Sequence, residues 1–153
     1  MKRLQTLQLL LEKERERRDE AMGALRAAVA QLDAQRQQGD GLAGYRSEYV
    51  AKWKAKFQQG TSMEIVRAYH GFNARLDQAI TQQQAVVAHA ERGVAAARER
   101  LVEREIRVAT VERLIQRRRE QLGRAEARRD QKSLDEMAAR LARIKGKELA
   151  GLA

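Results

Sequence analysis

The sequence predicts an all-α fold: a long antiparallel two-helix coiled-coil hairpin with a projecting C-terminal helix. Three observations support this fold class: a composition without proline, two series of residues at heptad spacing, and one clear break between the two series. Charged residues make up 34% of the 153 residues and aromatic residues only 4%, which is typical of long helices with polar faces in water. A thick globular core is therefore not expected, and residues 1–153 are interpreted as a single coiled-coil domain.

The first helix is expected at about residues 2–58, where mostly apolar residues recur at spacings of three and four. Gly39, Gly41 and Gly44 interrupt the pattern, and each glycine costs about 1 kcal/mol relative to alanine inside a helix. We expect a locally weakened helix there, with a kink or a short break as the alternative. The members of this series are Leu4, Leu11, Arg15, Arg18, Met22, Leu25, Val29, Leu32, Leu42, Tyr45, Tyr49, Trp53 and Phe57.

The break between the two series, at about residues 59–62, is the expected turn of the hairpin. Gly60 suits the left-handed position that follows a helix C-terminus, and Thr61 with Glu64 matches a capping box. With the tip at Gly60, the numbers of residues that face each other across the hairpin should sum to about 121. Tyr49 then faces Phe72.

The second helix is expected at about residues 63–145 and carries an unbroken heptad series. A 3.5-residue repeat of this length predicts a left-handed supercoil with a partner helix, which the first series can supply. Because the first helix runs out of chain opposite about position 120, the C-terminal end of the second should project alone. The series consists of Leu76, Ile80, Gln83, Val87, Ala90, Val94, Ala97, Leu101, Arg104, Val108, Val111, Ile115, Arg118, Leu122 and Ala125.

The net charge indicates which classes of partner the chain can attract, and the absence of cysteine indicates its cellular compartment. A formal net charge of +10 can attract nucleic acid, anionic lipid or an acidic protein surface. The absence of cysteine suits a reducing cytoplasm. Gln5, Thr6 and Gln8 interrupt the N-terminal leucines, so this stretch is interpreted as helix rather than signal peptide. We expect a cytoplasmic protein, at most peripheral to a membrane.

No pattern of catalytic or metal-ligating residues is visible in the sequence. His70 and His89 have no neighbour at the spacing of a helical metal site, and the glycines form no phosphate-binding loop. We therefore predict that the chain is not an enzyme and has no catalytic residue, metal or cofactor.

Every aromatic residue of the chain lies near the expected tip. A two-helix interface cannot bury them all, so some are expected to hold the bend together and others to stay partly exposed as anchors for a protein partner. Trp53, Phe57 and Tyr69 are expected in the first group, and some of Tyr45, Tyr49 and Phe72 in the second.

Basic residues gather toward the opposite end, and are interpreted mainly as a solvated helix face. Their separation from the aromatic residues argues against single-strand recognition by base stacking, which needs both kinds of residue interleaved. The clusters are Arg113, Arg117, Arg118 and Arg119; Arg124, Arg128 and Arg129; and Arg140, Arg143, Lys145 and Lys147.

Three segments resemble the FliJ family of flagellar type III export proteins. They are Tyr45-x-x-x-Tyr49, the stretch Tyr69-x-x-Phe72-x-x-x-Leu76-x-x-Ala79-Ile80-x-x-Gln83, and Arg129-Asp130-Gln131-Lys132-x-Leu134-Asp135-Glu136-x-Ala138-x-Arg140. The resemblance covers nearly the whole chain, and the Asp-Gln-Lys-x-Leu-Asp-Glu segment is its most specific part.

The resemblance implies a cytoplasmic stalk that inserts its terminal ends into the hexameric export ATPase FliI and contacts the export gate protein FlhA. Such a protein would also assist export chaperones, serve motility, associate with the cytoplasmic face of the inner membrane, and bind no nucleic acid. The implied gate-binding residues are Gln38, Leu42, Tyr45, Tyr49, Phe72, Leu76, Ala79 and Gln83. The implied ATPase-binding residues are Arg128, Arg129, Asp130, Gln131, Lys132, Asp135, Glu136 and Arg140.

Two other functions remain as alternatives. A stalk of the YscO type in a virulence injectisome would have the same architecture, although Asp130-Gln131-Lys132 favours the flagellar version. A basic helical nucleic-acid-binding protein would instead bind DNA or RNA tightly, with a steep dependence on salt.

Overall fold

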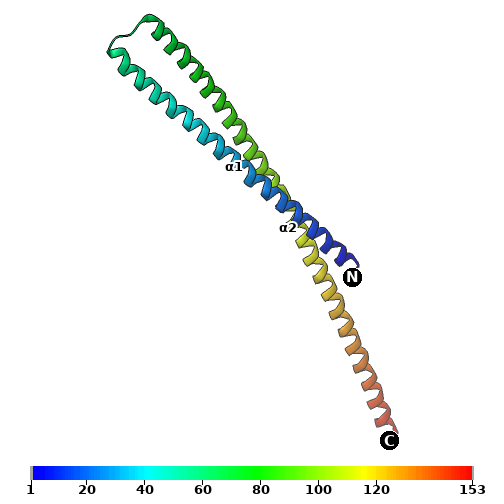
Figure 1. The fold of residues 1–153 in the computed structure, drawn as a ribbon. Helices are drawn as coiled ribbons and strands as arrows, with labels where there is room; N and C mark the ends of the chain where they lie inside the picture. The colour runs from blue at the N-terminus through cyan, green and yellow to red at the C-terminus, as the bar shows by residue number, and fades with distance from the viewer. Residues whose placement is uncertain (1, 153) are drawn as a thin grey trace. The chain divides into compact units, whose positions relative to one another are not determined.

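The computed structural model describes residues 2–152 and contains two long helices. Helix α1 spans Lys2–Gln58 and helix α2 spans Met63–Gly151 (Figure 1). Helix accounts for 97% of the structure, and no strand occurs in the part of the chain that is described. The predicted all-α class is confirmed. Helix α2 continues past residue 145, where its end was expected.

The chain divides into two compact units. The hairpin unit comprises Glu16–Glu105, and the terminal unit comprises the described residues of Met1–Arg15 and Ile106–Ala153. The prediction that the whole chain is one domain stays a prediction.

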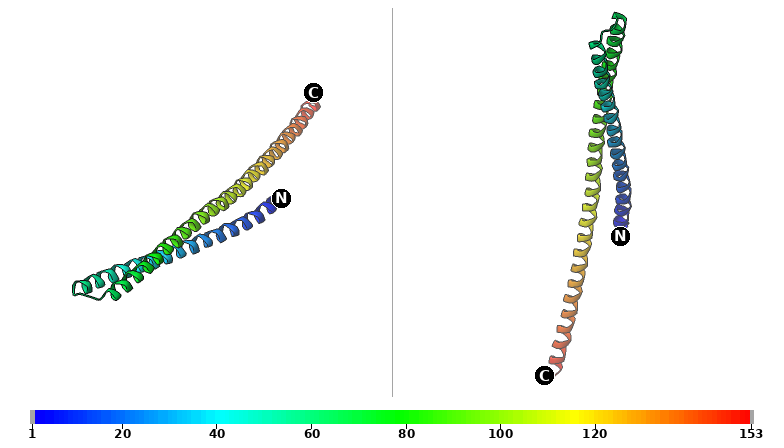
Figure 2. Two further views of the ribbon diagram at one scale, coloured as in Figure 1. Left: turned by 90° about the horizontal axis from the view of Figure 1, so that it is seen from above. Right: turned by 60° about the vertical axis from the view of Figure 1, so that its left-hand side comes forward.

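In the hairpin unit the two helical segments run antiparallel, side by side, and are joined at the tip (Figures 1 and 2). Arg36 pairs with Glu91 at 3.3 Å, and Arg46 Nε lies 2.6 Å from Asp77 Oδ1. Tyr49 packs against Phe72 with ring centroids 4.6 Å apart, which is the pairing expected from the position of the turn. The numbers of these three pairs sum to between 121 and 127, so the register agrees with the predicted one within a few residues.

The heptad series predicted for the second helix matches the buried face of α2. Every member from Leu76 to Leu122 is buried or half-buried, and only the last member, Ala125, is exposed. The least exposed members are Leu76, Val94, Val108, Val111 and Ile115, at 5–8%. Burial at strict heptad spacing is the pattern of a coiled-coil interface.

The series predicted for the first helix is partly wrong. Arg15 and Tyr45 belong to that series but are exposed. Helix α1 itself runs through the glycine segment without a break, as expected, so the alternative of a short break is wrong. The buried or half-buried face of α1 instead keeps a regular alternation of three and four, and polar or small residues occupy most of the positions that the prediction missed. The additional members are Leu7, Glu14, Ala21, Ala28, Gln35, Gly39 and Arg46. The prediction relied on apolar residues and therefore chose neighbours such as Met22 and Val29, because most of these additional positions carry little apolar surface.

The turn follows the expected location but uses a different N-cap. Gly60 adopts a φ of 87°, a left-handed conformation that glycine reaches without steric cost, and its N–H donates to Phe57 O at 3.2 Å. The predicted capping box of Thr61 and Glu64 is wrong, because Ser62 is the residue before α2. Its Oγ accepts from Ile65 N at 3.4 Å, and its carbonyl accepts from Val66 N at 3.3 Å.

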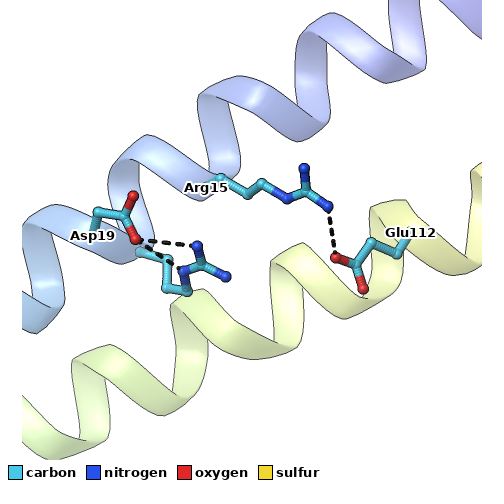
Figure 3. A network of polar contacts seen from close by, with 4 residues as sticks. Arg15, Asp19 and Glu112 are labelled. Carbon is cyan, nitrogen blue, oxygen red and sulfur yellow. Dashed lines mark hydrogen bonds and ion pairs between the residues drawn. The ribbon is translucent and has the colours of Figure 1, made fainter.

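In the terminal unit, Arg15 of α1 reaches across to Glu112 of α2 at 3.2 Å (Figure 3). The second ion pair drawn there, Arg18 with Asp19 at 3.1 Å, lies within α1 and belongs to the hairpin unit. Every described residue of α2 beyond Leu122 is exposed. That this segment projects alone stays a prediction. Within residues 2–152, neither helix has an apolar stretch that could cross a bilayer.

Candidate partner-binding surfaces

The aromatic side chains of the hairpin unit form one connected cluster with Tyr49 at its centre. Tyr49 contacts four other rings at centroid distances of 4.6–6.3 Å, and two of these rings, Tyr69 and Phe72, come from α2. Phe57 meets Tyr69 edge to face at 5.1 Å. Aromatic pairs of this kind contribute about 0.5–1.5 kcal/mol beyond the area that they bury. The cluster therefore holds the two helices together near the turn, as expected for Trp53, Phe57 and Tyr69.

The cluster also presents aromatic surface to solvent, as predicted. Tyr45 is 51% exposed and touches only Tyr49 among the rings, while Tyr49 and Phe72 are half-buried. Arg75 lies over the Phe72 ring, with the guanidinium carbon 6.0 Å from the centroid. An exposed tyrosine beside fixed aromatic side chains is a typical anchor of protein interfaces.

The eight residues implied as gate-binding divide into exposed and buried groups, all within the hairpin unit. Gln38 and Tyr45 are exposed, and Leu42, Tyr49, Phe72 and Ala79 are half-buried. Leu76 and Gln83 are buried, at 8% and 9% exposure. A rigid partner can therefore reach the first group directly, whereas Leu76 and Gln83 lie in the interface between α1 and α2.

An open groove of about 340 Å³ lies in the hairpin unit on the other flank of the α1 seam. Arg36, Asp40 and Ala43 line it from α1, and by helix periodicity they lie across Gly39 from Gln38, Leu42 and Tyr45. The ion pair of Arg36 with Glu91 closes one edge. Sequence reasoning missed these residues, because their only signal is the three-and-four spacing of polar positions along α1.

The residues implied as ATPase-binding lie on α2 in the terminal unit, and all of them are exposed. Lys132, Glu136 and Arg140 follow one another at intervals of four, so they lie along one face of the helix. Gln131 Nε2 donates to Asp135 Oδ1 at 3.2 Å. The segment thus presents an extended polar face with both signs of charge.

An apolar stripe that sequence reasoning missed covers another face of the same segment. Leu134, Met137, Leu141 and Ile144 are 55–65% exposed and recur at spacings of three and four. This spacing would have revealed the stripe in the sequence. Exposed apolar side chains that follow one face of a helix typically mark an interaction surface.

Within residues 2–152 no group of three or more His, Cys, Asp or Glu side chains is placed to hold a metal ion. His70 is exposed and its ring packs edge to face on Tyr69 at 5.3 Å.

These features define a helical protein whose candidate binding surfaces are exposed side chains along its two helices. A family model described as "Flagellar FliJ protein" matches residues 1–147. The chain belongs to the FliJ family and is a component of flagellar protein export. No match was found among curated proteins or among solved structures.

Proposed function

We propose that this chain is a stalk that links the hexameric export ATPase, FliI-like, to the export gate protein, FlhA-like, and assists export chaperones. It acts in the cytoplasm, peripherally at the cytoplasmic face of the inner membrane. The observation that carries the proposal is that each unit has its own exposed surface of a different kind: aromatic in the hairpin unit, polar and aliphatic in the terminal unit. A protein that joins two partners needs two such surfaces.

The proposed gate surface is made by exposed side chains that rest on a fixed aromatic cluster. Gln38, Leu42 and Tyr45 contact the gate in this account. The Tyr49 ring packs against both Tyr45 and Phe72, so Phe72 fixes Tyr49 and Tyr49 in turn fixes Tyr45. The buried residues of the implied set, Leu76 and Gln83, act through the packing of the hairpin.

The proposed ATPase surface is the α2 segment beyond Leu122. It projects as a single helix until the ATPase is bound, and it then uses both its polar face and its apolar stripe. Lys132, Glu136 and Arg140 form ion pairs with the ring of subunits, while Leu134, Met137 and Leu141 become buried. Each Å² of apolar surface that becomes buried contributes about 25 cal/mol to the binding free energy, so the stripe is the larger source of affinity. The charged residues set the orientation of the bound helix.

The gate surface is tested by a pull-down with the cytoplasmic region of the gate protein. Gln38→Ala, Leu42→Ala and Tyr45→Ala combined should reduce binding at least tenfold without loss of helical content, since two of the three side chains are exposed and the third is half-buried. A matched control combines Gln37→Ala and Lys52→Ala, which are exposed residues of the same helix outside the proposed surface. Equal binding by both variants would reject the surface.

The ATPase surface is tested by the rate of ATP hydrolysis of the partner ATPase with the purified chain added. The wild-type chain should stimulate hydrolysis, and Lys132→Ala, Glu136→Ala and Arg140→Ala combined should remove most of the stimulation. The control is Glu99→Ala, Glu103→Ala and Arg107→Ala, which are also exposed and spaced by four on α2. Loss of stimulation in the control alone would exclude the proposed segment.

Nucleic-acid binding is the competing function that the net charge of +10 favours. An electrophoretic mobility shift assay near physiological salt separates the two functions. The stalk proposal expects no shift at micromolar protein, whereas a nucleic-acid-binding protein would give a shift that weakens steeply with salt. That the chain binds no nucleic acid stays a prediction. Because the matched family is flagellar, the injectisome alternative is the weaker one.

A further inference from the structure

Gln83 is a buried polar residue whose side-chain amide donates hydrogen bonds to the opposite helix of the hairpin unit. It is 9% exposed, although its position in the heptad series would normally hold an aliphatic side chain. Its Nε2 donates to the main-chain O of Gln35 at 2.9 Å and to Gln35 Oε1 at 2.8 Å. A glutamine amide has two N–H donors, so both are used on one residue of α1.

Gly39 gives the Gln83 side chain room, and the adjacent seam positions of α2 are apolar. Gly39 lies beside Gln83, and a Cβ at position 39 would be 3.5 Å from Gln83 Cγ, an ordinary contact. The neighbouring seam positions of α2 are Ile80 and Val87, which are half-buried. The polar pair is therefore set between apolar layers of the same interface.

The apolar part of the interface specifies the register of this region weakly. The α1 seam contains Ala28, Gly39 and other small or polar residues, which interlock little with the larger side chains of α2. A slip of one heptad would move the helices by about 10 Å relative to each other. Gln83 would then face Ala28 or Leu42 in place of Gln35, and the buried N–H that donates to Gln35 Oε1 would lose its acceptor.

We propose that Gln83 and Gln35 form a polar lock that fixes the register of the two helices in the hairpin unit. A single buried polar pair contributes little net stability, because the same groups bond to water in the unfolded chain, but the bond between the two side chains forms in one register only. Gln83 is thus a positioning residue that sets which α2 residues lie beside the α1 surface of Gln38, Leu42 and Tyr45. The lock does not depend on the identity of any partner.

The lock is tested by electron paramagnetic resonance distances in the full chain. The sequence has no cysteine, so Ala30→Cys with Ala74→Cys introduces two unique sites, both exposed and both in the hairpin unit. The spin-labelled chain should give one narrow distance distribution. Adding Gln83→Leu should keep the helical content and produce a second population displaced by about 10 Å, the length of one heptad.

Matched variants separate a lock from a general effect of substitution. Gln82→Leu makes the same change at an exposed neighbour and should leave one distance. Gln35→Leu removes the side-chain acceptor and should also produce a second population, which tests the lock independently of Gln83→Leu. Gln35→Glu keeps an acceptor and should restore one distance. A single unchanged distance in both leucine variants at positions 35 and 83 would overturn the proposal, as would the same second population in Gln82→Leu.

Discussion

Tyr49 of α1 and Phe72 of α2 face each other with ring centroids 4.6 Å apart and ring planes inclined by 56°. These two residues are separated by the turn at Gly60, so their contact fixes how α2 returns along α1 in the hairpin unit. Tyr49 also contacts Tyr45, Trp53 and Tyr69, which places it at the centre of the aromatic cluster.

Tyr49→Ala should lower the free energy of unfolding by about 2 kcal/mol, because a half-buried ring with four aromatic contacts is removed. Tyr45→Ala should lower it by about 0.5 kcal/mol or less, since Tyr45 is half exposed. Urea denaturation followed by circular dichroism measures both. Equal losses in the two variants would show that the cluster is not centred on Tyr49.

Ser62→Ala should cost about 1 kcal/mol, because its hydroxyl caps the first turn of α2 through Ile65 N. Thr61→Ala should stay within about 0.5 kcal/mol, since the residue is exposed and does not cap the helix. The same denaturation experiment compares them. A larger loss for Thr61→Ala would restore the capping box with Glu64 and contradict the observed turn.

Gly60→Ala should destabilise the chain by about 1–2 kcal/mol, because alanine is strained at a φ of 87°. Gly41→Ala should have the opposite sign and stabilise by about 0.5–1 kcal/mol, since α1 is helical there and an added Cβ meets nothing within 4 Å. Thermal unfolding should show opposite shifts in midpoint. A lower midpoint for Gly41→Ala would mean that the glycine segment does not remain helical in solution.

Ile115→Ala should cost about 2–4 kcal/mol, because its side chain is 5% exposed within the terminal unit. Leu141→Ala removes a similar volume from a side chain that is 65% exposed, and the free energy should change by less than about 0.5 kcal/mol. Equilibrium denaturation of the isolated chain measures both changes in the free energy of unfolding. A substantial loss for Leu141→Ala would place a partner on the apolar stripe even without the ATPase.

The sequence predicted α2 better than α1 for a physical reason. The seam of α2 is rich in Leu, Ile and Val, so its heptad spacing is visible as a hydrophobic pattern and its burial followed the prediction to Leu122. The seam of α1 includes Glu14, which is 7% exposed, and Gln35, whose side chain is bonded to Gln83. A polar residue in a seam has no signature in hydropathy, because its burial depends on a partner that the sequence places far away.

The candidate surfaces were predicted unevenly for the same reason. Exposure of aromatic side chains near the turn could be expected, because two helices cannot cover six aromatic rings. For Gln83 there were two different expectations from the sequence, because the heptad series placed it between the helices and the resemblance assigned it to a partner surface. Its burial agrees with the heptad series. The apolar stripe through Leu134 and Met137 is visible in the sequence as residues spaced by three and four. It was missed because the residues that the resemblance implied in this segment are all polar.

We propose that one chain binds the export ATPase and the export gate at the same time through different surfaces. Analytical ultracentrifugation of the chain mixed with both purified partners tests this most directly. A stalk with two separate binding surfaces should form a ternary complex that sediments faster than either binary complex and is lost in the Gln38→Ala, Leu42→Ala, Tyr45→Ala variant. Displacement of one partner by the other, with only binary complexes present at saturating concentrations, would contradict it.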